Sequence, residues 1–554
     1  MIKIYLFLLK RYQNLISKAF FYVCFYVSTI IFYLTYSVLD SPDFSKYYKY
    51  FEYYSGSISS VNLEQGHIYF FLNYLIVLLL SNIYEFLTLN EIINLAVHIG
   101  NSLIFLFGCL GLKKYLSKKY ETKNTYLVLS ILCFLPPAFE LRMTFKPEII
   151  AFASLGWLFY FLNKFMEKKD AKSFLKFSTI FALLISSKIS IAFLISIILM
   201  FEVLQSDKNI FKKLQLKHAI LLIVLISSLL IENSSMNGKF INQVVHEEKY
   251  NNTAEFSFFT KFNQKDFIDN PNKYFFYDSF IGITLFDSFN DFFQFYQNSE
   301  QSDLSKDRKQ FFKVVFRGGQ VLPINIKYDK EDGFLTFSGL YDRGWNENNY
   351  IDETRMKISF IFSSVIYFLL FLFGIIKKDI RPIMMSSFIG MLIVSFSALG
   401  FFGTNNFNPN LGDSFKTFYY GYFLVFSFAV LFSEIFKRNI LKKTISISVI
   451  LFMLFFLGFP FKYSQQIQES IINKNSQLFT CEINYLPINL LLNIQNEINC
   501  DDNKNTLNMI SPDAELNSLN YKLIKIPYVN LLIFVIYFLL FTKFGESKFI
   551  RRLE

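Results

Sequence analysis

The sequence AFFYVCFYVSTIIFYLTYSVL, residues 19–39, runs directly into DSPDF, residues 40–44. An apolar run of about 20 residues is long enough to cross a lipid bilayer as a helix. Basic residues precede this run at Lys3, Lys10, Arg11 and Lys18. Because lysine and arginine gather on the cytoplasmic side of membrane helices, the sequence predicts a cytoplasmic N-terminus, with Asp40 and Asp43 at the outer surface.

The composition of the whole chain is that of a membrane protein. Of its 554 residues, 53% are hydrophobic, and many apolar runs approach the length of a bilayer span. No small-residue cleavage site follows the first run, so we expect a retained helix. The net charge of +11 lies largely in short loops, where it sets orientation and meets anionic lipids, and no nucleic-acid motif accompanies it. The four histidines are far apart and form no metal-binding motif.

The apolar runs predict an all-α polytopic protein with about twelve transmembrane helices. We expect these helices at roughly 19–39, 92–112, 125–141, 148–165, 173–187, 189–205, 218–232, 357–376, 383–402, 417–436, 444–460 and 528–542. With this count, all the basic clusters between the runs fall on the cytoplasmic side. These clusters begin at Lys113, Lys164, Lys208, Lys377, Lys437 and Lys548. The prediction is a multi-pass plasma (inner) membrane protein with both termini in the cytoplasm.

One apolar stretch, residues 68–80, is left out of the count of crossings. A crossing there would invert the later basic clusters, so we expect 67–90 to lie in the outer interface or to re-enter without crossing. The count also requires 173–205 to form two short crossings that meet near Lys188. A lysine is easier to accommodate at such a break near the interface than at the middle of one long helix.

This topology divides the chain into five parts. They are an N-terminal transmembrane core (1–232) with a first outer loop (40–91), a large outer loop or domain (233–356), C-terminal transmembrane helices (357–460), a second outer segment (461–527), and a last transmembrane helix with a basic cytoplasmic tail (528–554). Polar and aromatic residues are interleaved in 233–356, which favours a folded lid or a domain lying against the membrane over a linker.

The five cysteines fall into two groups. Cys481 and Cys500 lie in the second outer segment, where an oxidising compartment favours a disulfide between them. Cys24, Cys109 and Cys133 lie in predicted spans and are interpreted as packing residues.

Charged residues stand at four predicted outer ends of spans. They are Asp40 with Asp43, the segment RMTFKPE (142–148), Lys188, and the segment NPNLGDSFK (408–416). Each one alone is typical of an anchor at the bilayer edge. Carboxylates and cations near hydrocarbon are costly unless they are paired or used, so their convergence on one side points to a functional site.

These segments carry a resemblance to a known superfamily. DFSKY (43–47) resembles the Asp-x-x-x-Tyr that follows the first span of GT-C glycosyltransferases, which include protein O-mannosyltransferases and aminoarabinose and other lipid-A-modifying transferases. KPE (146–148) and LLISSK (183–188) resemble the Arg/Lys-Pro-Asp/Glu segment and the leucine-rich helix ending in lysine. GDSFKTFY (412–419) is similar to the late Gly-x-x-x-Lys-x-Arg-Tyr stretch, with Phe418 in place of arginine.

The resemblance covers most of residues 1–230 and a patch near 405–430. It implies an enzyme that transfers a hexose or pentose from a polyprenyl-phosphate donor to a lipid, glycan or protein acceptor at the outer, periplasmic face of the membrane. It implies Asp43 as the general base, and Asp40 as a second carboxylate that orients the acceptor or holds a metal. The donor phosphate would be bound by cations, for which the candidates are Lys146, Lys416, Lys188 and Arg142. The superfamily is not uniform in needing a metal, so no cofactor is assigned and a divalent metal stays open.

Two other function classes are compatible with the sequence. A polysaccharide polymerase of the O-antigen or exopolysaccharide type is also polytopic, and EQGH (64–67) would suit one, with Arg317 and Arg343 in the large outer segment. A transporter or lipid flippase is the other alternative. Transporters usually show inverted repeats or interrupted helices in two halves, and this sequence shows neither.

Overall fold

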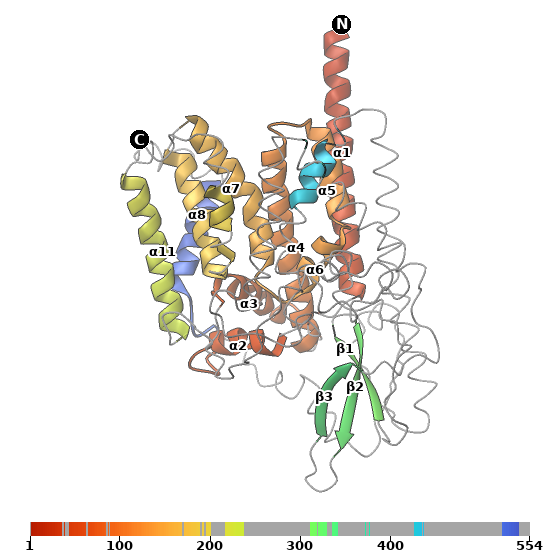
Figure 1. Ribbon diagram of the computed structural model, residues 1–554, viewed down its shortest axis with the longest axis vertical. Coiled ribbons are helices and arrows are strands. Elements are labelled where there is room, and N and C mark those ends of the chain that lie inside the picture. The colour runs from red at the N-terminus through yellow and green to blue at the C-terminus, as the bar shows by residue number, and fades with distance from the viewer. Residues whose placement is uncertain are drawn as a thin grey trace.

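The computed structural model describes most of the N-terminal two hundred residues and several later segments. The described residues are mainly 2–35, 44–61, 65–84, 89–168, 171–188, 191–192, 195–200, 216–237, 311–317, 320–328, 335–341, 426–434 and 523–541. The described helices form a bundle, and a small sheet lies beyond one end of it (Figure 1).

Three described helices contain segments long and apolar enough to cross a membrane. They are α1 (Ile2–Thr35), α4 (Leu89–Leu116) and α7 (Ile149–Lys168). The apolar segments are Tyr12–Tyr33, Glu91–Leu116 and Ile149–Glu167. They confirm the coarse prediction of an α-helical membrane protein. The first segment begins several residues before the predicted 19–39, because α1 extends back to Ile2 and ends at Thr35.

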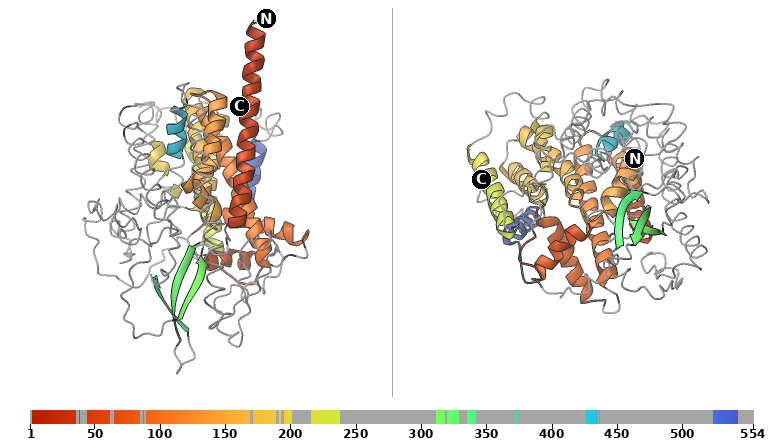
Figure 2. Two further views of the ribbon diagram at one scale, coloured as in Figure 1. Left: turned by 90° about the vertical axis from the view of Figure 1, so that its right-hand side faces the viewer. Right: turned by 60° about the horizontal axis from the view of Figure 1, so that its bottom comes forward.

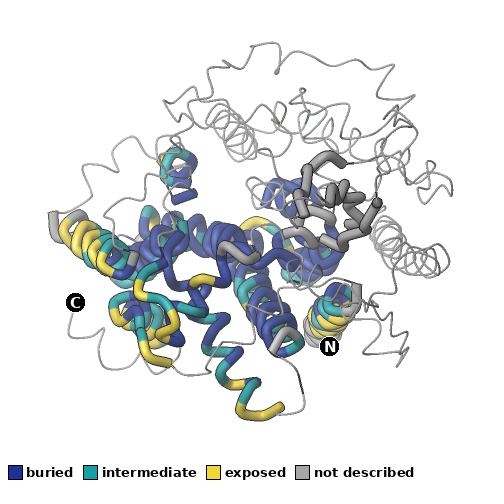
Figure 3. The backbone as a smooth tube through the Cα atoms, turned by 90° about the horizontal axis from the view of Figure 1, so that it is seen from below, coloured by how far each residue is buried: buried dark blue, intermediate teal, exposed yellow. Residues whose placement is uncertain are grey.

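The surface of the peripheral helices is apolar, as expected of a surface that faces lipid. Figure 3 shows buried residues gathered in the middle of the bundle and exposed residues on the outward sides of the peripheral helices. On α1 the exposed side chains include Leu15, Val23 and Ile30, and on α11 (Leu216–Asn237) they include Ile223 and Ile231. Water would penalise such a surface, whereas lipid chains solvate it.

Two short helices, α2 (Phe44–Tyr54) and α3 (Ile68–Ser81), lie at the end of the bundle away from the N-terminus (Figures 1 and 2). With 14 residues, α3 is about 21 Å long, which is shorter than the roughly 30 Å of a bilayer core. This length suits the predicted interfacial or re-entrant course of 67–90. If the N-terminus of α1 is cytoplasmic, α2 and α3 lie at the outer end.

The predicted single helix at 125–141 is wrong. The chain there forms α5 (Thr122–Leu132) and a separate α6 (Pro136–Met143). The break falls where Pro136 and Pro137 occupy the first positions of α6. Proline has no backbone N–H to donate and is tolerated only in a first turn, so it begins a new helix and cannot continue the preceding one.

The predicted break at Lys188 agrees with the end of α8 (Ala171–Ser187). The backbone N–H of Lys188 still donates to Leu184 O, and helical backbone is found again at Ile191. The bounds of the helix α23 (Tyr528–Phe541) agree with those predicted for the last helix, 528–542, but its 14 described residues are as few as those of α3 and do not by themselves show a crossing. It packs against α8 and α11, and Glu232 of α11 accepts hydrogen bonds at 2.6 and 2.7 Å from the first-turn N–H groups of Val529 and Asn530.

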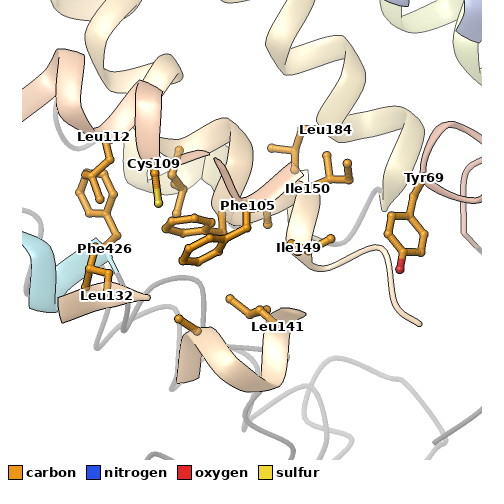
Figure 4. Packing of buried hydrophobic residues seen from close by; sticks show 14 of the residues in the cluster. Tyr69, Phe105, Cys109, Leu112, Leu132, Leu141, Ile149, Ile150, Leu184 and Phe426 are labelled. Carbon is orange, nitrogen blue, oxygen red and sulfur yellow. The ribbon is translucent and has the colours of Figure 1, made fainter. Parts of the chain in front are cut away.

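The core of the bundle is built on a close approach of α4 and α7. A Cβ atom on Gly156 would stand 2.3 Å from the backbone nitrogen of Leu112, so only glycine lets these helices approach so closely. The indole N–H of Trp157 donates to Phe107 O at 3.0 Å. Figure 4 shows the packing of buried residues around Phe105 and Cys109 of α4. This rigid pair positions the segment that precedes α7.

The segment 233–356, which we expect to be a large outer loop or domain, contains a sheet that the sequence did not predict. Strands β1 (Phe311–Arg317), β2 (Gln320–Tyr328) and β3 (Leu335–Tyr341) pair antiparallel in the order β1-β2-β3. Two glycines lie between β1 and β2 in the sequence, a pair typical of two-residue hairpin turns, and Arg317 pairs with Gln320. The protein therefore adds a small β-meander to its helical part.

The two ends of the bundle should be accessible from opposite sides of the membrane. Ser59 follows α2, and Lys119 follows α4 at the other end of the bundle; both are exposed. In a cysteine-free background, Ser59→Cys should react with a membrane-impermeant maleimide added outside intact cells. Lys119→Cys should react only after permeabilisation. Labelling of both variants from outside would contradict the predicted topology.

Candidate functional site

A cluster of charged and polar side chains lies at the end of the bundle that carries α2 and α3. It consists of Tyr47, Gln65, Lys146, Glu148 and Lys188, and we call it the lysine–glutamate cluster. Its members come from α2, the turn before α3, the segment between α6 and α7, and the residue after α8. Two of the predicted phosphate ligands, Lys146 and Lys188, thus lie at the same end of the bundle, one just before α7 and one just after α8.

The irregular segment between α6 and α7 is held by buried hydrogen bonds. The side-chain amide of Asn101, on α4, donates to the carbonyl oxygens of Arg142 and Thr144, both at 2.9 Å. Tyr69, on α3, donates its hydroxyl to Asn101 Oδ1 at 2.8 Å. Burial raises the pKa of Tyr69 well above its usual value, so this phenol stays a neutral donor. These bonds satisfy one carbonyl in the last turn of α6 and one in the segment after it, and they help to position Lys146 and Glu148.

Lys146 is only 1% exposed, and its ammonium lies over an aromatic ring. Its Nζ atom is 5.7 Å from the centroid of the Tyr47 ring. That ring packs in turn on Phe70 of α3, with centroids 5.2 Å apart. A cation over the face of a tyrosine is stabilised by the ring quadrupole, most strongly when water is excluded. The contact therefore keeps a positive charge in apolar surroundings beside the first turn of α2.

Glu148 and Lys188 form a buried ion pair. Lys188 Nζ donates to Glu148 Oε1 at 2.6 Å, and the side chains are 13% and 1% exposed respectively. The second carboxylate oxygen, Oε2, is buried and has no hydrogen-bond partner among the described residues. The pair joins the residue that precedes α7 to the residue that follows α8. Its charges lie within the protein, so solvent screens them far less than it screens surface pairs.

The turn before α3 is joined by hydrogen bonds to both α2 and the end of α8. The backbone N–H of Gly66 donates to Ser187 O at 2.9 Å, and a Cβ atom on Gly66 would stand 1.3 Å from Ser186 O. Gln65 donates its Nε2 to the Tyr47 hydroxyl at 3.3 Å and accepts from Tyr50 at its carbonyl oxygen at 2.5 Å. The Oε1 atom of Gln65 is buried and has no hydrogen-bond partner in the described part of the chain. The cluster therefore contains two buried acceptor oxygens, Gln65 Oε1 and Glu148 Oε2, without a hydrogen-bond partner among the described residues.

Arg142 lies apart from this cluster. Its guanidinium is 1% exposed and donates to Ser28 Oγ at 2.7 Å and to Thr29 Oγ1 at 2.6 Å, both on α1. Its central carbon lies 4.5 Å from the ring centroid of Phe32 and 4.8 Å from that of Phe105. An enclosed side chain that joins α1, α4 and α6 favours a structural role over the predicted contact with a donor phosphate.

Replacing Arg142 by Ala should therefore destabilise the bundle. The change leaves the Ser28 and Thr29 hydroxyls without their partner and opens a cavity between aromatic rings. We expect a loss of about 2–4 kcal/mol in the free energy of unfolding, seen as a Tm several degrees lower in detergent. Lys119→Ala, at an exposed position, is the matched control. An unchanged Tm for Arg142→Ala would remove the structural role.

The other predicted site residues lie outside the described residues. These are Asp40, Asp43, Lys416, Cys481 and Cys500. Asp43 directly precedes Phe44, the first residue of α2, and stands four positions before Tyr47 in the sequence. Within the described part of the chain, no group of three His, Cys, Asp or Glu side chains lies close enough to hold a metal ion.

The sequence interpretation missed Tyr69 and Asn101, and it noted Gln65 only within the EQGH segment of the polymerase alternative. The signal for Asn101 was available, because it is a polar amide within the apolar run 92–112. Buried amides in such runs need partners, and here the partners are backbone carbonyls. The partnership of Glu148 with Lys188 joins residues 40 positions apart and has no signal in one sequence. No protein-family model, curated protein or solved structure matches the chain.

Proposed function

We propose that this chain is a membrane glycosyltransferase that moves a sugar from a polyprenyl-phosphate donor to an acceptor at the outer face of the membrane. The observation that supports the proposal is the convergence of Lys146, Lys188 and Tyr47 at the end of the bundle where α2 begins. A lipid-linked phosphate would lie at such a position, with its prenyl chain among the apolar helices. The two ammonium groups would face its charge in a site that excludes water.

The proposed reaction needs a base, a leaving group and cations that stabilise that leaving group. Asp43 takes the proton from the acceptor hydroxyl, and the acceptor oxygen forms a bond to the anomeric carbon of the sugar. The bond from that carbon to the phosphate oxygen breaks, and its electron pair stays on the phosphate. Lys146 and Lys188 stabilise the charge that develops there, which is worth most where water is excluded. The products are the glycosylated acceptor and a polyprenyl phosphate.

A transfer assay tests this proposal directly. The purified protein would be incubated with a radiolabelled polyprenyl-phosphate sugar and membrane lipids as acceptors, beside the Asp43→Asn variant. Hydrolysis or transfer by the wild type, lost in the variant, supports a glycosyltransferase. Activity only with a pyrophosphate-linked oligosaccharide would support the polysaccharide polymerase. Turnover of neither donor would contradict both enzyme classes and leave the transporter or flippase.

A further inference from the structure

The packing of α7 against α8 involves more than the Glu148–Lys188 ion pair. The two helices are separated by only two residues in the sequence and pack against one another. Buried ion pairs usually contribute little net stability compared with an apolar pair of similar volume, because both charges lose their hydration. The pair is better explained by its effect on charge at the site than by its effect on the fold.

The two partners are not equally accessible. Lys188 retains 13% side-chain exposure, whereas Glu148 has 1%. Of the two side chains, that of Lys188 is therefore the more accessible to a ligand that approaches the cluster. The carboxylate holds that ammonium through Oε1 alone, because Oε2 has no partner among the described residues. An ammonium has three donors, so Lys188 can turn toward a second anion while Glu148 still attracts it.

We propose that Glu148 competes with the phosphate of a prenyl phosphate for the ammonium of Lys188, and thereby limits how tightly the site holds that phosphate. This inference rests on the proposed function. The donor is a phosphodiester with one negative charge, and the product is a phosphomonoester with about 1.5 to 2 at neutral pH. Two lysines without a carboxylate would hold the product more tightly than the donor. Glu148 offsets part of that preference and favours release of the product.

Binding of farnesyl phosphate, a short prenyl monophosphate, tests the inference without any turnover. Calorimetry on the full chain in detergent would compare wild type with Glu148→Gln, using farnesol to correct for partition into micelles. Removing the competing charge should lower the Kd by about five- to tenfold, because the ammonium of Lys188 is then no longer held by a carboxylate and can turn toward the phosphate. The matched control is Glu167→Gln. Glu167 also pairs with a lysine, Lys118 at 3.0 Å, but is largely exposed near the other end of α7, so its Kd should equal that of wild type.

A second pair of variants shows whether Glu148 acts through Lys188. Lys188→Met should raise the Kd, and Glu148→Gln/Lys188→Met should have the same Kd as Lys188→Met alone. This comparison stands even if Glu148→Gln alone does not fold, since the double variant removes both charges. A double variant that differs from Lys188→Met would overturn the inference.

The outcomes separate this inference from the proposed function. Wild-type binding of farnesyl phosphate that Glu148→Gln leaves unchanged or weakens would overturn the competition and leave the donor site standing. Absence of binding by the wild type would overturn both the competition and the proposed donor site. Tighter binding by Glu148→Gln, abolished in the Lys188→Met background, supports the inference even where the transfer assay fails.

Discussion

Replacing Asp43 by Asn is expected to lower the rate of sugar transfer by a factor of about 10² or more. The change keeps the size of the side chain and removes the charge that accepts the proton of the acceptor. Asp43 directly precedes α2, whose first turn carries Tyr47 into the lysine–glutamate cluster. The proposed base and the proposed phosphate ligands are thus connected by one short stretch of chain.

The measurement for Asp43 is kcat with a saturating labelled donor, beside the thermal stability of each protein. Asp40→Asn is the matched control, because Asp40 is the other carboxylate of the same loop and is expected to orient the acceptor, with a smaller loss. Wild-type turnover by a folded Asp43→Asn protein would remove Asp43 as the base and transfer the role to Asp40. An equal, severe loss in both variants would indicate that the two carboxylates act as a pair.

Replacing Lys146 by Met is expected to lower kcat/KM for the donor by about 2–4 kcal/mol of transition-state stabilisation, which is roughly 30- to 1,000-fold. The phosphate gains charge as the sugar departs, so an ammonium close to it stabilises the transition state more than the bound donor. Lys146 is suited to this role because it is buried over Tyr47, where solvent does not screen its charge. Lys416→Met should show a loss of the same kind, if that residue also binds the phosphate.

A lysine that only anchors its helix at the bilayer edge would behave differently from a lysine that binds the donor phosphate. Lys49→Met is the matched control, because Lys49 is exposed on the same helix that carries Tyr47. It should leave kcat/KM unchanged. Lys146→Arg should restore part of the activity, since the charge persists while the geometry of the donors differs. Unchanged kinetics in Lys146→Met would assign the donor phosphate to Lys188 and its neighbours.

The described helices also show where sequence patterns are reliable. The end of α8 beside Lys188 and the bounds of α23 follow from the sequence, because apolar length and the position of a charge are local properties. The split of 125–141 at Pro136 was visible in the residues as well. The mean hydropathy of an apolar run is taken over all its residues, so two prolines hardly change it. They nevertheless remove two backbone N–H donors, and a helix cannot continue through them.

By itself, the sequence determined that this is a helical membrane protein and which helix ends carry charge. Only the tertiary structure decided which of these charges meet. Arg142, four positions from Lys146, donates to hydroxyls of α1, whereas Glu148 pairs with Lys188, the residue that follows α8. The physical reason is that helices form from contacts a few residues apart, whereas ion pairs and buried hydrogen bonds form between surfaces that packing brings together. Two glycines determine how those surfaces meet. Gly156 allows the close approach of α4 and α7, and Gly66 allows the turn before α3 to donate a hydrogen bond to the backbone of Ser187.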